Sequence, residues 1–234
     1  MARFFRSHYH AARTQVVLVG DVRAAHGQRL IEQAFSGMPA SDLPRFARPT
    51  EPLQTLPRVR SLSRDVQMAH LAIAWHLPGQ QSGSLAASQL AALVLGQGES
   101  SRLVQRLKHE KRLVHDVYCE AYAGIDVGLF IVGASLEVDH VDEAMAALGQ
   151  ELCNVVETDI GDDELGKAKL LLHAQCVHRM ETMQGRAEEL GFWQSVRGDP
   201  LFEAQHQADV DAVDASHLRV HLATHLCAST TNFV

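Results

Sequence analysis

Three histidines near the carboxyl end of the chain have a spacing that suits metal ligation. The stretch HLRVHLATH places His217, His221 and His225 at positions i, i+4 and i+8, so on a helix all three fall along one face. Neighbouring imidazoles on such a face can chelate zinc. Successive helical turns lie about 5.4 Å apart, however, so three ligands in line cannot all reach one ion. We therefore predict no functional metal site in this chain and keep these three histidines as the candidates for ion binding.

A second stretch with possible chemistry is GESSRLVQRLKHEKRLVHDVY, residues 98–118, where a glycine turn precedes two serines and a run of basic residues. Glycines before a helix N-terminus can cradle a phosphate, but such loops need a preceding strand and a further glycine. The favoured interpretation is a sharp turn between two helices. Gly96 and Gly98 allow the unusual backbone conformations of that turn, and the hydroxyl of Ser100 or Ser101 caps the helix that follows.

The elements that position these residues follow from hydrophobic periodicity. The patterns predict strands at 14–22, 66–77, 115–124 and 127–137 with a further strand starting at 230, the first of them buried, and helices at 24–35, 82–96, 100–111, 141–158, 162–196 and 212–226. The two strands around residues 124–128 form an antiparallel hairpin. This order predicts an α+β fold, with helices packed on one face of a mainly antiparallel sheet.

Composition and charge exclude several classes of partner. The chain has 21 Lys and Arg residues against 28 Asp and Glu residues, a formal net charge of −7, and no basic cluster, so we expect no nucleic-acid partner. The longest apolar runs, at 16–19 and 90–96, are far too short to cross a bilayer, so we expect no membrane partner. Bacterial periplasm and cytoplasm both remain open as the compartment.

The cysteines predict free thiols. Cys119, Cys153, Cys176 and Cys227 are scattered and include no C-x-x-C pair. Metal knuckles and disulfide frameworks need tighter or paired spacings. We therefore expect partly buried thiols without a metal or a disulfide.

Four segments, in their order and spacing, resemble one family. They are FFRSHYHAARTQVVLVGDV (4–22), LGQGESSRLVQRLKHEKRLVHDVY (95–118), DDELGKAK (162–169) and GRAEELG (185–191). Together they resemble the second, C-terminal domain of the pitrilysin/insulinase-type zinc metallopeptidases, the inverzincins, which include mitochondrial processing peptidase. The resemblance implies a metallopeptidase-like α/β sandwich.

The resemblance also implies a division of the chain. Residues 37–57 hold five of the seven prolines, which is typical of a linker. Residues 1–45 are then the closing helix–strand–helix segment of a preceding domain together with the linker. Residues 46–234 are the inactive, peptidase-like C-terminal domain.

The zinc motif of the family is missing. The chemistry of these enzymes depends on H-x-x-E-H carried on one helix, and none of the 14 histidines here is followed by Glu-His at that spacing. The resemblance therefore implies that the zinc belongs to a partner domain, in the same polypeptide or a separate subunit, and that this chain alone is inactive. Its expected role is to close the chamber and help bind peptide substrate. Two alternatives are an enzyme with an unrecognised site and a structural or assembly subunit without a role in proteolysis.

The candidate peptide-contacting residues come from the same resemblance. In many relatives an arginine and a tyrosine, seven positions apart at the helix-to-strand passage, reach toward the substrate carbonyl, where such groups stabilise an oxyanion. Aligning HEKRLVHDVY places His109 at the arginine position and His115 at the tyrosine position, with one residue absent between them. Arg112 or Tyr118 can substitute if the backbone shifts. Because histidine lacks the permanent charge of arginine, we expect this contribution to be weakened or lost.

Overall fold

The computed structural model describes residues 4–5, 8–38, 49, 51–52, 54–226 and 231–233. These residues form two compact units: residues 1–50 with 175–205, and residues 51–174 with 206–234. The described residues do not include the boundary predicted after residue 45 or most of the proline-rich linker, so the division of the chain stays a prediction. Cys227 also lies outside the described residues.

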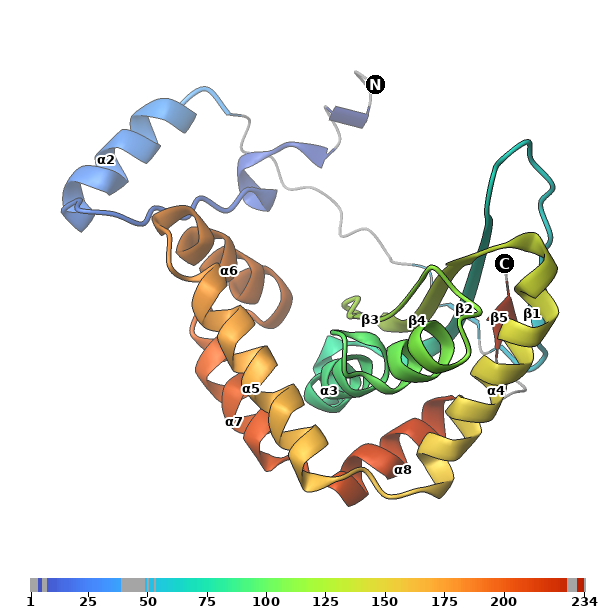
Figure 1. Ribbon diagram of the computed structural model, residues 1–234. Coiled ribbons are helices and arrows are strands. Elements are labelled where there is room, and N and C mark those ends of the chain that lie inside the picture. Colours follow the sequence, from blue (N-terminus) through green and yellow to red (C-terminus); the bar gives the residue numbers. More distant parts are fainter. Residues whose placement is uncertain are drawn as a thin grey trace. The chain divides into compact units, whose positions relative to one another are not determined.

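The larger unit is built on a five-stranded sheet with the order β1-β5-β2-β4-β3 (Figure 1). The strands are β1 (Arg58–Val59), β2 (Ala69–Pro78), β3 (Asp116–Tyr122), β4 (Val127–Leu136) and β5 (Asn232–Phe233). The predicted α+β fold and the hairpin of β3 and β4 are confirmed. The sheet is mixed, however, because β1 and β5 pair in parallel while the other pairs are antiparallel.

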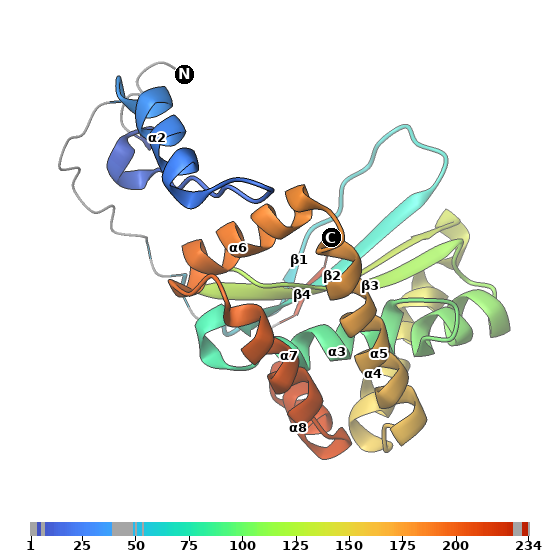
Figure 2. The same ribbon diagram turned by 90° about the vertical axis from the view of Figure 1, so that its left-hand side faces the viewer.

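Three helices cover one face of this sheet: α3 (Leu85–Gly96), α4 (Val141–Glu157) and α8 (Ala215–His225) (Figure 2). The alternation along β2 explains this, because Leu71, Ile73, Trp75 and Leu77 are all buried and the residues between them are not. Helix α3 is buried almost all round, as its apolar composition requires. The core of the unit therefore lies between β2–β4 and these helices.

Two predicted helices differ from the structure. The helix expected at 100–111 is mainly a π-helix, η3 (Val104–Glu110), whose Val104 and Leu107 are buried. The long helix expected at 162–196 is divided into α5 (Asp162–Arg179) and α6 (Met183–Arg197). The break follows from capping, because the Thr182 hydroxyl accepts the Gly185 N–H at 2.9 Å and begins a new helix. A further helix, α7 (Phe202–Ala212), precedes α8.

The turn before η3 is a site of close backbone approach. A Cβ at Gly96 would lie 2.4 Å from the backbone nitrogen of Cys119, and Gly98 has φ +86°. Both glycines are therefore required, as predicted. The predicted cap is wrong: the Ser101 hydroxyl donates to the Gly98 carbonyl at 2.7 Å, and the Ser100 hydroxyl is bonded by Lys167. The Ser101 hydroxyl thus bonds a carbonyl of the turn itself, and no side chain caps the N–H groups at the start of η3.

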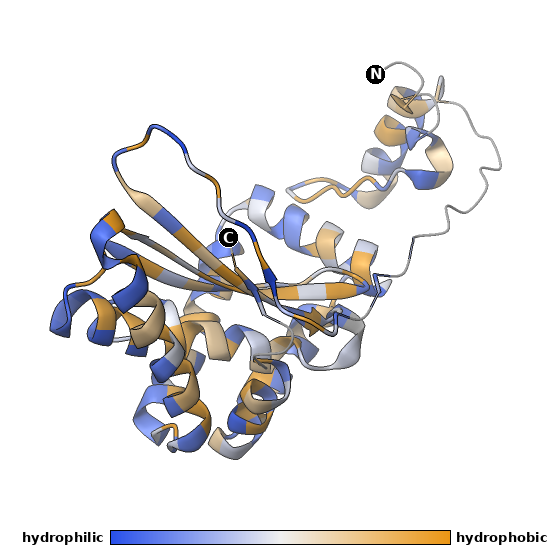
Figure 3. Ribbon diagram, turned by 90° about the vertical axis from the view of Figure 1, so that its right-hand side faces the viewer, coloured by the Kyte–Doolittle hydropathy of each residue, from blue (hydrophilic) through white to orange (hydrophobic). Residues whose placement is uncertain are grey.

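The smaller unit contains α2 (Ala24–Phe35), at the predicted position, and an extended segment before it, residues 14–19. The prediction of a buried strand there is wrong. The segment pairs with no strand among the described residues, and Val16 and Leu18 are 41% and 51% exposed. In Figure 3 this extended, hydrophobic segment lies beside α2. Val16 and Leu18 are exposed because this unit, as described, contains no sheet that could pair with the segment.

Candidate functional site

The passage from η3 into β3 is closed by an unusual backbone conformation at Arg112. The Leu113 N–H donates to the Leu107 carbonyl at 2.9 Å, a bond of the type that ends a helix through a left-handed residue. Arg112 has φ +55° and is the only non-glycine residue with positive φ in the described ranges. This conformation favours glycine, so Arg112 carries backbone strain at the end of the helix.

The two predicted histidines are each engaged with a different acid. His109 Nε2 lies 2.8 Å from Glu99 Oε2, and this bond holds the pKa of Glu99 below its usual value. His115 Nε2 lies 3.0 Å from Glu137 Oε1. The structure therefore directs the two side chains to separate partners, one in the turn before η3 and one directly after β4.

Lys108 is a residue that the sequence alignment missed. It stands seven positions before His115, the spacing expected from the resemblance, without any gap between the two. Its Nζ lies 3.7 Å from Asp116 Oδ1 at the start of β3. Counting back from His115 without the assumed deletion would have identified it.

Tyr118 lies on the face of the sheet that α3, α4 and α8 do not cover. A Cβ built at Gly133 of β4 would lie 2.3 Å from Tyr118 Cζ, so the tyrosine ring lies flat against the strand over this glycine. The residue is still 46% exposed. Tyr118 thus offers an aromatic surface on the uncovered face of β3 and β4.

The uncovered face is composed of rows that run across the strands. In register, Tyr118 stands opposite Gly133, Glu120 opposite Ile131, and Tyr122 opposite Leu129. The next positions on β2 are Ala72, Ala74 and His76. The face combines aromatic and aliphatic side chains with acidic groups at the β3 edge.

Arg102, at the start of η3, holds the helix-to-strand passage in place. Its Nε and Nη2 donate to the two carboxylate oxygens of Glu164, each at 2.8 Å, and Nη2 also donates to the Asp159 carbonyl at 3.1 Å. Glu164 belongs to the acidic first turn of α5, where the helix dipole favours negative charge. This bidentate pair fixes η3 against the N-terminus of α5.

The histidine ladder lies on α8, as predicted, but its middle member is a core residue. His221 is 8% exposed, and its Nε2 lies 3.0 Å from the Ser88 hydroxyl of α3. Burial, together with the smaller effect of the nearby His225 and His217, lowers the pKa of His221 to about 4. Within the described part of the chain, no group of three or more His, Cys, Asp or Glu residues could hold a metal ion.

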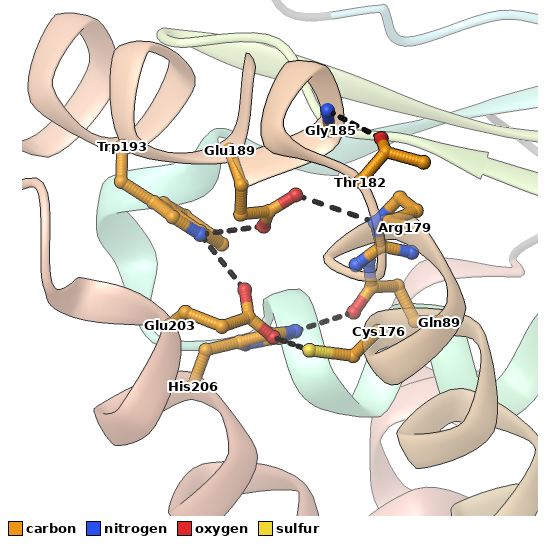
Figure 4. Close-up of polar contacts among 9 residues, drawn as sticks. All are labelled: Gln89, Cys176, Arg179, Thr182, Gly185, Glu189, Trp193, Glu203 and His206. Atoms are coloured by element: carbon orange, nitrogen blue, oxygen red, sulfur yellow. Dashed lines mark hydrogen bonds and ion pairs between the residues drawn. The ribbon is translucent and has the colours of Figure 1, made fainter. Parts of the chain in front are cut away.

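A polar cluster in the smaller unit contains a thiol and carboxylates that could react, but Cys176 and Glu203 are buried from solvent (Figure 4). The Cys176 thiol donates to Glu203 at 2.8 Å, and Trp193 Nε1 donates to both Glu203 and Glu189, each at 2.8 Å. Burial raises the pKa of Glu189, and the neighbouring Glu203 raises it further, while Arg179 lies 3.3 Å from Glu189. The cluster joins α5, α6 and α7, which is a structural role, and Trp193 is buried.

Of the cysteines in the described ranges, Cys119 and Cys176 are buried free thiols and Cys153 is an exposed one, as predicted. In the same ranges, no helix is both long enough and apolar enough to span a membrane.

Residues 1–172 match the family model of the peptidase M16 inactive domain. The chain belongs to this family. It is 29% identical over 198 residues to an uncharacterized zinc protease of Streptomyces coelicolor, covering 81% of this chain and 42% of that protein. It is 27% identical over 194 residues to one of Mycobacterium tuberculosis, covering 80% and 43%. The M16 chain therefore spans less than half the length of these curated relatives.

Solved structures share the fold of this M16 domain. The peptidase M16 inactive domain of Pseudomonas fluorescens superposes with a TM-score of 0.87 at 16% identity, covering all of this chain and 57% of that one. A protease of Helicobacter pylori gives a TM-score of 0.80 at 21% identity, covering 92% and 53%. The predicted family is confirmed, and the chain is an inactive domain of the zinc-protease type.

Proposed function

We propose that this chain is the non-catalytic half of a zinc peptidase, and that it closes the chamber and binds peptide substrate for a zinc-bearing partner domain. The observation that carries the proposal is the match of residues 1–172 to the inactive domain of peptidase M16. The relatives named as zinc proteases are more than twice as long as the region matched, which supports a zinc-bearing half in the same polypeptide or in a separate subunit.

The partner domain is expected to bind the extended segment at residues 14–19. Val16 and Leu18 are apolar residues with exposed side chains in a segment without helix. A hollow of about 420 Å³ lies beside them, lined also by Val22 and Ile31. A segment with these properties gains both backbone hydrogen bonds and apolar burial by adding to a sheet edge of another domain. This supports the proposed assignment of residues 1–45 to a preceding domain.

Lys108 and Tyr118 are the residues that we expect to contact peptide. Lys108 places its amino group near the start of β3, 3.7 Å from Asp116, and Tyr118 exposes its ring on the uncovered face. A lysine and a phenol can both donate hydrogen bonds to a peptide carbonyl. His109 and His115 are bonded to Glu99 and Glu137, and Arg112 is in a left-handed backbone conformation, so we rank these three lower as contacts.

The test compares this chain alone with the form that includes the zinc-bearing half, using quenched fluorescent peptides and zinc analysis by atomic absorption. We expect no hydrolysis and no stoichiometric zinc in the chain alone, and hydrolysis with about one zinc per assembled pair. In the assembled form, Lys108→Ala and Tyr118→Ala should lower kcat/KM. Chelator-sensitive hydrolysis by the chain alone would overturn the proposal. Equal activity of the zinc-bearing half without this chain would instead favour a structural or assembly subunit.

The contact at residues 14–19 has its own matched control. The double variant Val16→Asp, Leu18→Asp should abolish association with the zinc-bearing half in analytical ultracentrifugation, because it buries two charges in an apolar interface. Leu170→Asp makes the same change at a leucine of α5 that is 69% exposed and should leave association intact. Unchanged association of the double variant would contradict the proposed contact.

A further inference from the structure

Two glutamates of the smaller unit are bonded to the same indole nitrogen. Trp193 Nε1 donates to Glu189 Oε1 and to Glu203 Oε2, each at 2.8 Å (Figure 4). The two carboxylate oxygens therefore lie no farther apart than twice this distance. The side chain of Glu189 is 13% exposed and Glu203 is 8% exposed, so water does little to screen one carboxyl group from the other.

The remaining oxygens of the two carboxyl groups contact α5. The Cys176 thiol donates to Glu203 Oε1 at 2.8 Å, and Arg179 Nε donates to Glu189 Oε2 at 3.3 Å. The thiol and the indole are uncharged donors, and the Arg179 side chain is 48% exposed, so water weakens the effect of its charge. If both carboxyl groups were ionised, two negative charges would lie close together against these three donors in a buried position, which is strongly unfavourable.

Other titratable and charged groups lie on α6 and α7. His206 Nε2 of α7 lies 2.8 Å from Gln89 Oε1. The guanidinium of Arg197, at the end of α6, lies 4.3 Å from the centre of the Phe202 ring. Glu188 of α6 is exposed. Because His206 and Glu188 are titratable groups close to the pair in the chain, each serves as a control for a titration of the pair.

Two carboxyl groups held this close lose their protons in two separate steps, because the first negative charge opposes the second. One proton kept between them turns a carboxylate into a donor and replaces a repulsion with a charge-assisted O–H···O bond. In agreement with this, burial raises the pKa of Glu189, and Glu203 raises it further. A proton that the folded state binds more tightly than the unfolded chain stabilises the fold, and this stabilisation is lost as the pH rises through the folded-state pKa.

We propose that Glu189 and Glu203 share one proton in the folded chain at neutral pH, and that loss of this proton at higher pH releases α6 from α5 and α7. Glu189 belongs to α6, Glu203 to α7, and their donors Cys176 and Arg179 to α5, so the shared proton holds three helices together at one point. Ionisation of the second carboxyl group turns the hydrogen bond between α6 and α7 into a repulsion. This proton site acts within one chain and does not need the zinc-bearing half.

Carbon-13 NMR of the chain labelled at its glutamate carboxyl carbons tests for the proton without any variant. We expect the signals of two carboxyl groups to show one bound proton at pH 7, above the range in which exposed glutamates ionise. Arg179→Met should move this titration to higher pH, because the guanidinium favours the ionised form of Glu189. Spectra in which every glutamate carboxyl group is ionised at pH 7 would overturn the proposal.

Fluorescence of Trp193 reports the release of α6. We expect its emission to move to longer wavelength as the pH rises from about 7 to 9, because the indole then meets water. Trp75→Phe leaves Trp193 as the single tryptophan and should retain this shift. Glu203→Gln, an uncharged isostere, should abolish the shift, whereas Glu188→Gln and His206→Gln should retain it. An emission that stays constant in the native chain, or a shift that persists in Glu203→Gln, would overturn the release of α6.

Discussion

The ring of Tyr118 lies over the Cα of Gly133 on the neighbouring strand, so close that a Cβ at residue 133 would lie 2.3 Å from Tyr118 Cζ. An aromatic ring over a strand glycine covers backbone that a side chain would otherwise protect. The pair fixes the orientation of the tyrosine on the uncovered face, and this orientation is what the proposed peptide contact depends on.

Gly133→Ala should displace this ring without unfolding the domain. The far end of a half-exposed tyrosine can swing away, so we expect a loss of about 0.5–1 kcal/mol in the free energy of unfolding. Gly96→Ala is the contrasting variant, because its Cβ would lie 2.4 Å from the backbone nitrogen of Cys119 and backbone cannot move aside. We expect it to cost about 3 kcal/mol or more, and urea unfolding of both variants measures the difference.

Arg112→Gly should stabilise the domain. Residue 112 has φ +55°, a left-handed conformation that costs a non-glycine residue about 1 kcal/mol. Glycine removes this strain but increases the freedom of the unfolded chain, so the expected net gain is about 0.5 kcal/mol. Lys111→Gly, at the preceding position with ordinary helical φ, should destabilise by about 1 kcal/mol. Destabilisation by Arg112→Gly would show that the side chain makes a contact that outweighs the backbone strain.

Arg102→Met should destabilise the larger unit by about 1–2 kcal/mol, because it breaks a bidentate pair and leaves Glu164 without its cation. The two side chains are 21% and 27% exposed. Arg219 Nη1 donates a hydrogen bond to Asp159 Oδ1, and the Asp159 side chain is 94% exposed. Arg219→Met should therefore change the free energy of unfolding by no more than about 0.5 kcal/mol. Similar losses from both substitutions, measured by chemical denaturation, would contradict the anchoring role of Arg102.

Acidification should destabilise the chain through His221. Its folded-state pKa of about 4 lies below the ordinary value of 6.5, so the folded protein binds fewer protons than the unfolded chain. The stability that depends on neutral His221 is complete above about pH 6.5 and is lost as the pH falls toward 4. Between pH 7 and pH 5 we expect a loss of about 2 kcal/mol from this group. His221→Gln should remove this part of the pH dependence. If the free energy of unfolding of the variant still falls between pH 7 and pH 5 as in the native chain, His221 is not the group responsible.

Thiol reactivity should separate the cysteines by burial. In a Cys227→Ser background, an aromatic disulfide reagent should modify the exposed Cys153 at once. Burial raises the pKa of Cys119 well above its usual range, and burial together with Glu203 raises the pKa of Cys176 to about 12. Because the thiolate is the reactive form, both should react only after unfolding. Fast modification of Cys176 in the native chain would show that the buried cluster opens.

Much of the fold could be predicted from periodicity. The alternating residues of β2 and β4, the helix at 24–35 and the buried Trp75 reflect local patterns in which each side chain faces core or solvent. The glycine turn at Gly96 and Gly98 was also predictable, because few other residues allow its backbone. The family resemblance came from the order of such segments, and the comparisons confirm it.

Other features depend on contacts between residues far apart in the chain. Nothing local distinguishes a strand that lies in a sheet from the exposed segment at Val16 and Leu18, which pairs with no strand in the described ranges, because pairing needs a partner that periodicity does not supply. The parallel pairing of β1 with β5 likewise joins the two ends of the larger unit. The burial of His221 against Ser88 and the ion pair of Lys108 with Asp116 exist only once α8 meets α3 and η3 meets β3. The sequence by itself therefore determined the elements and the family, and the tertiary structure decided which faces and edges remain available for a partner.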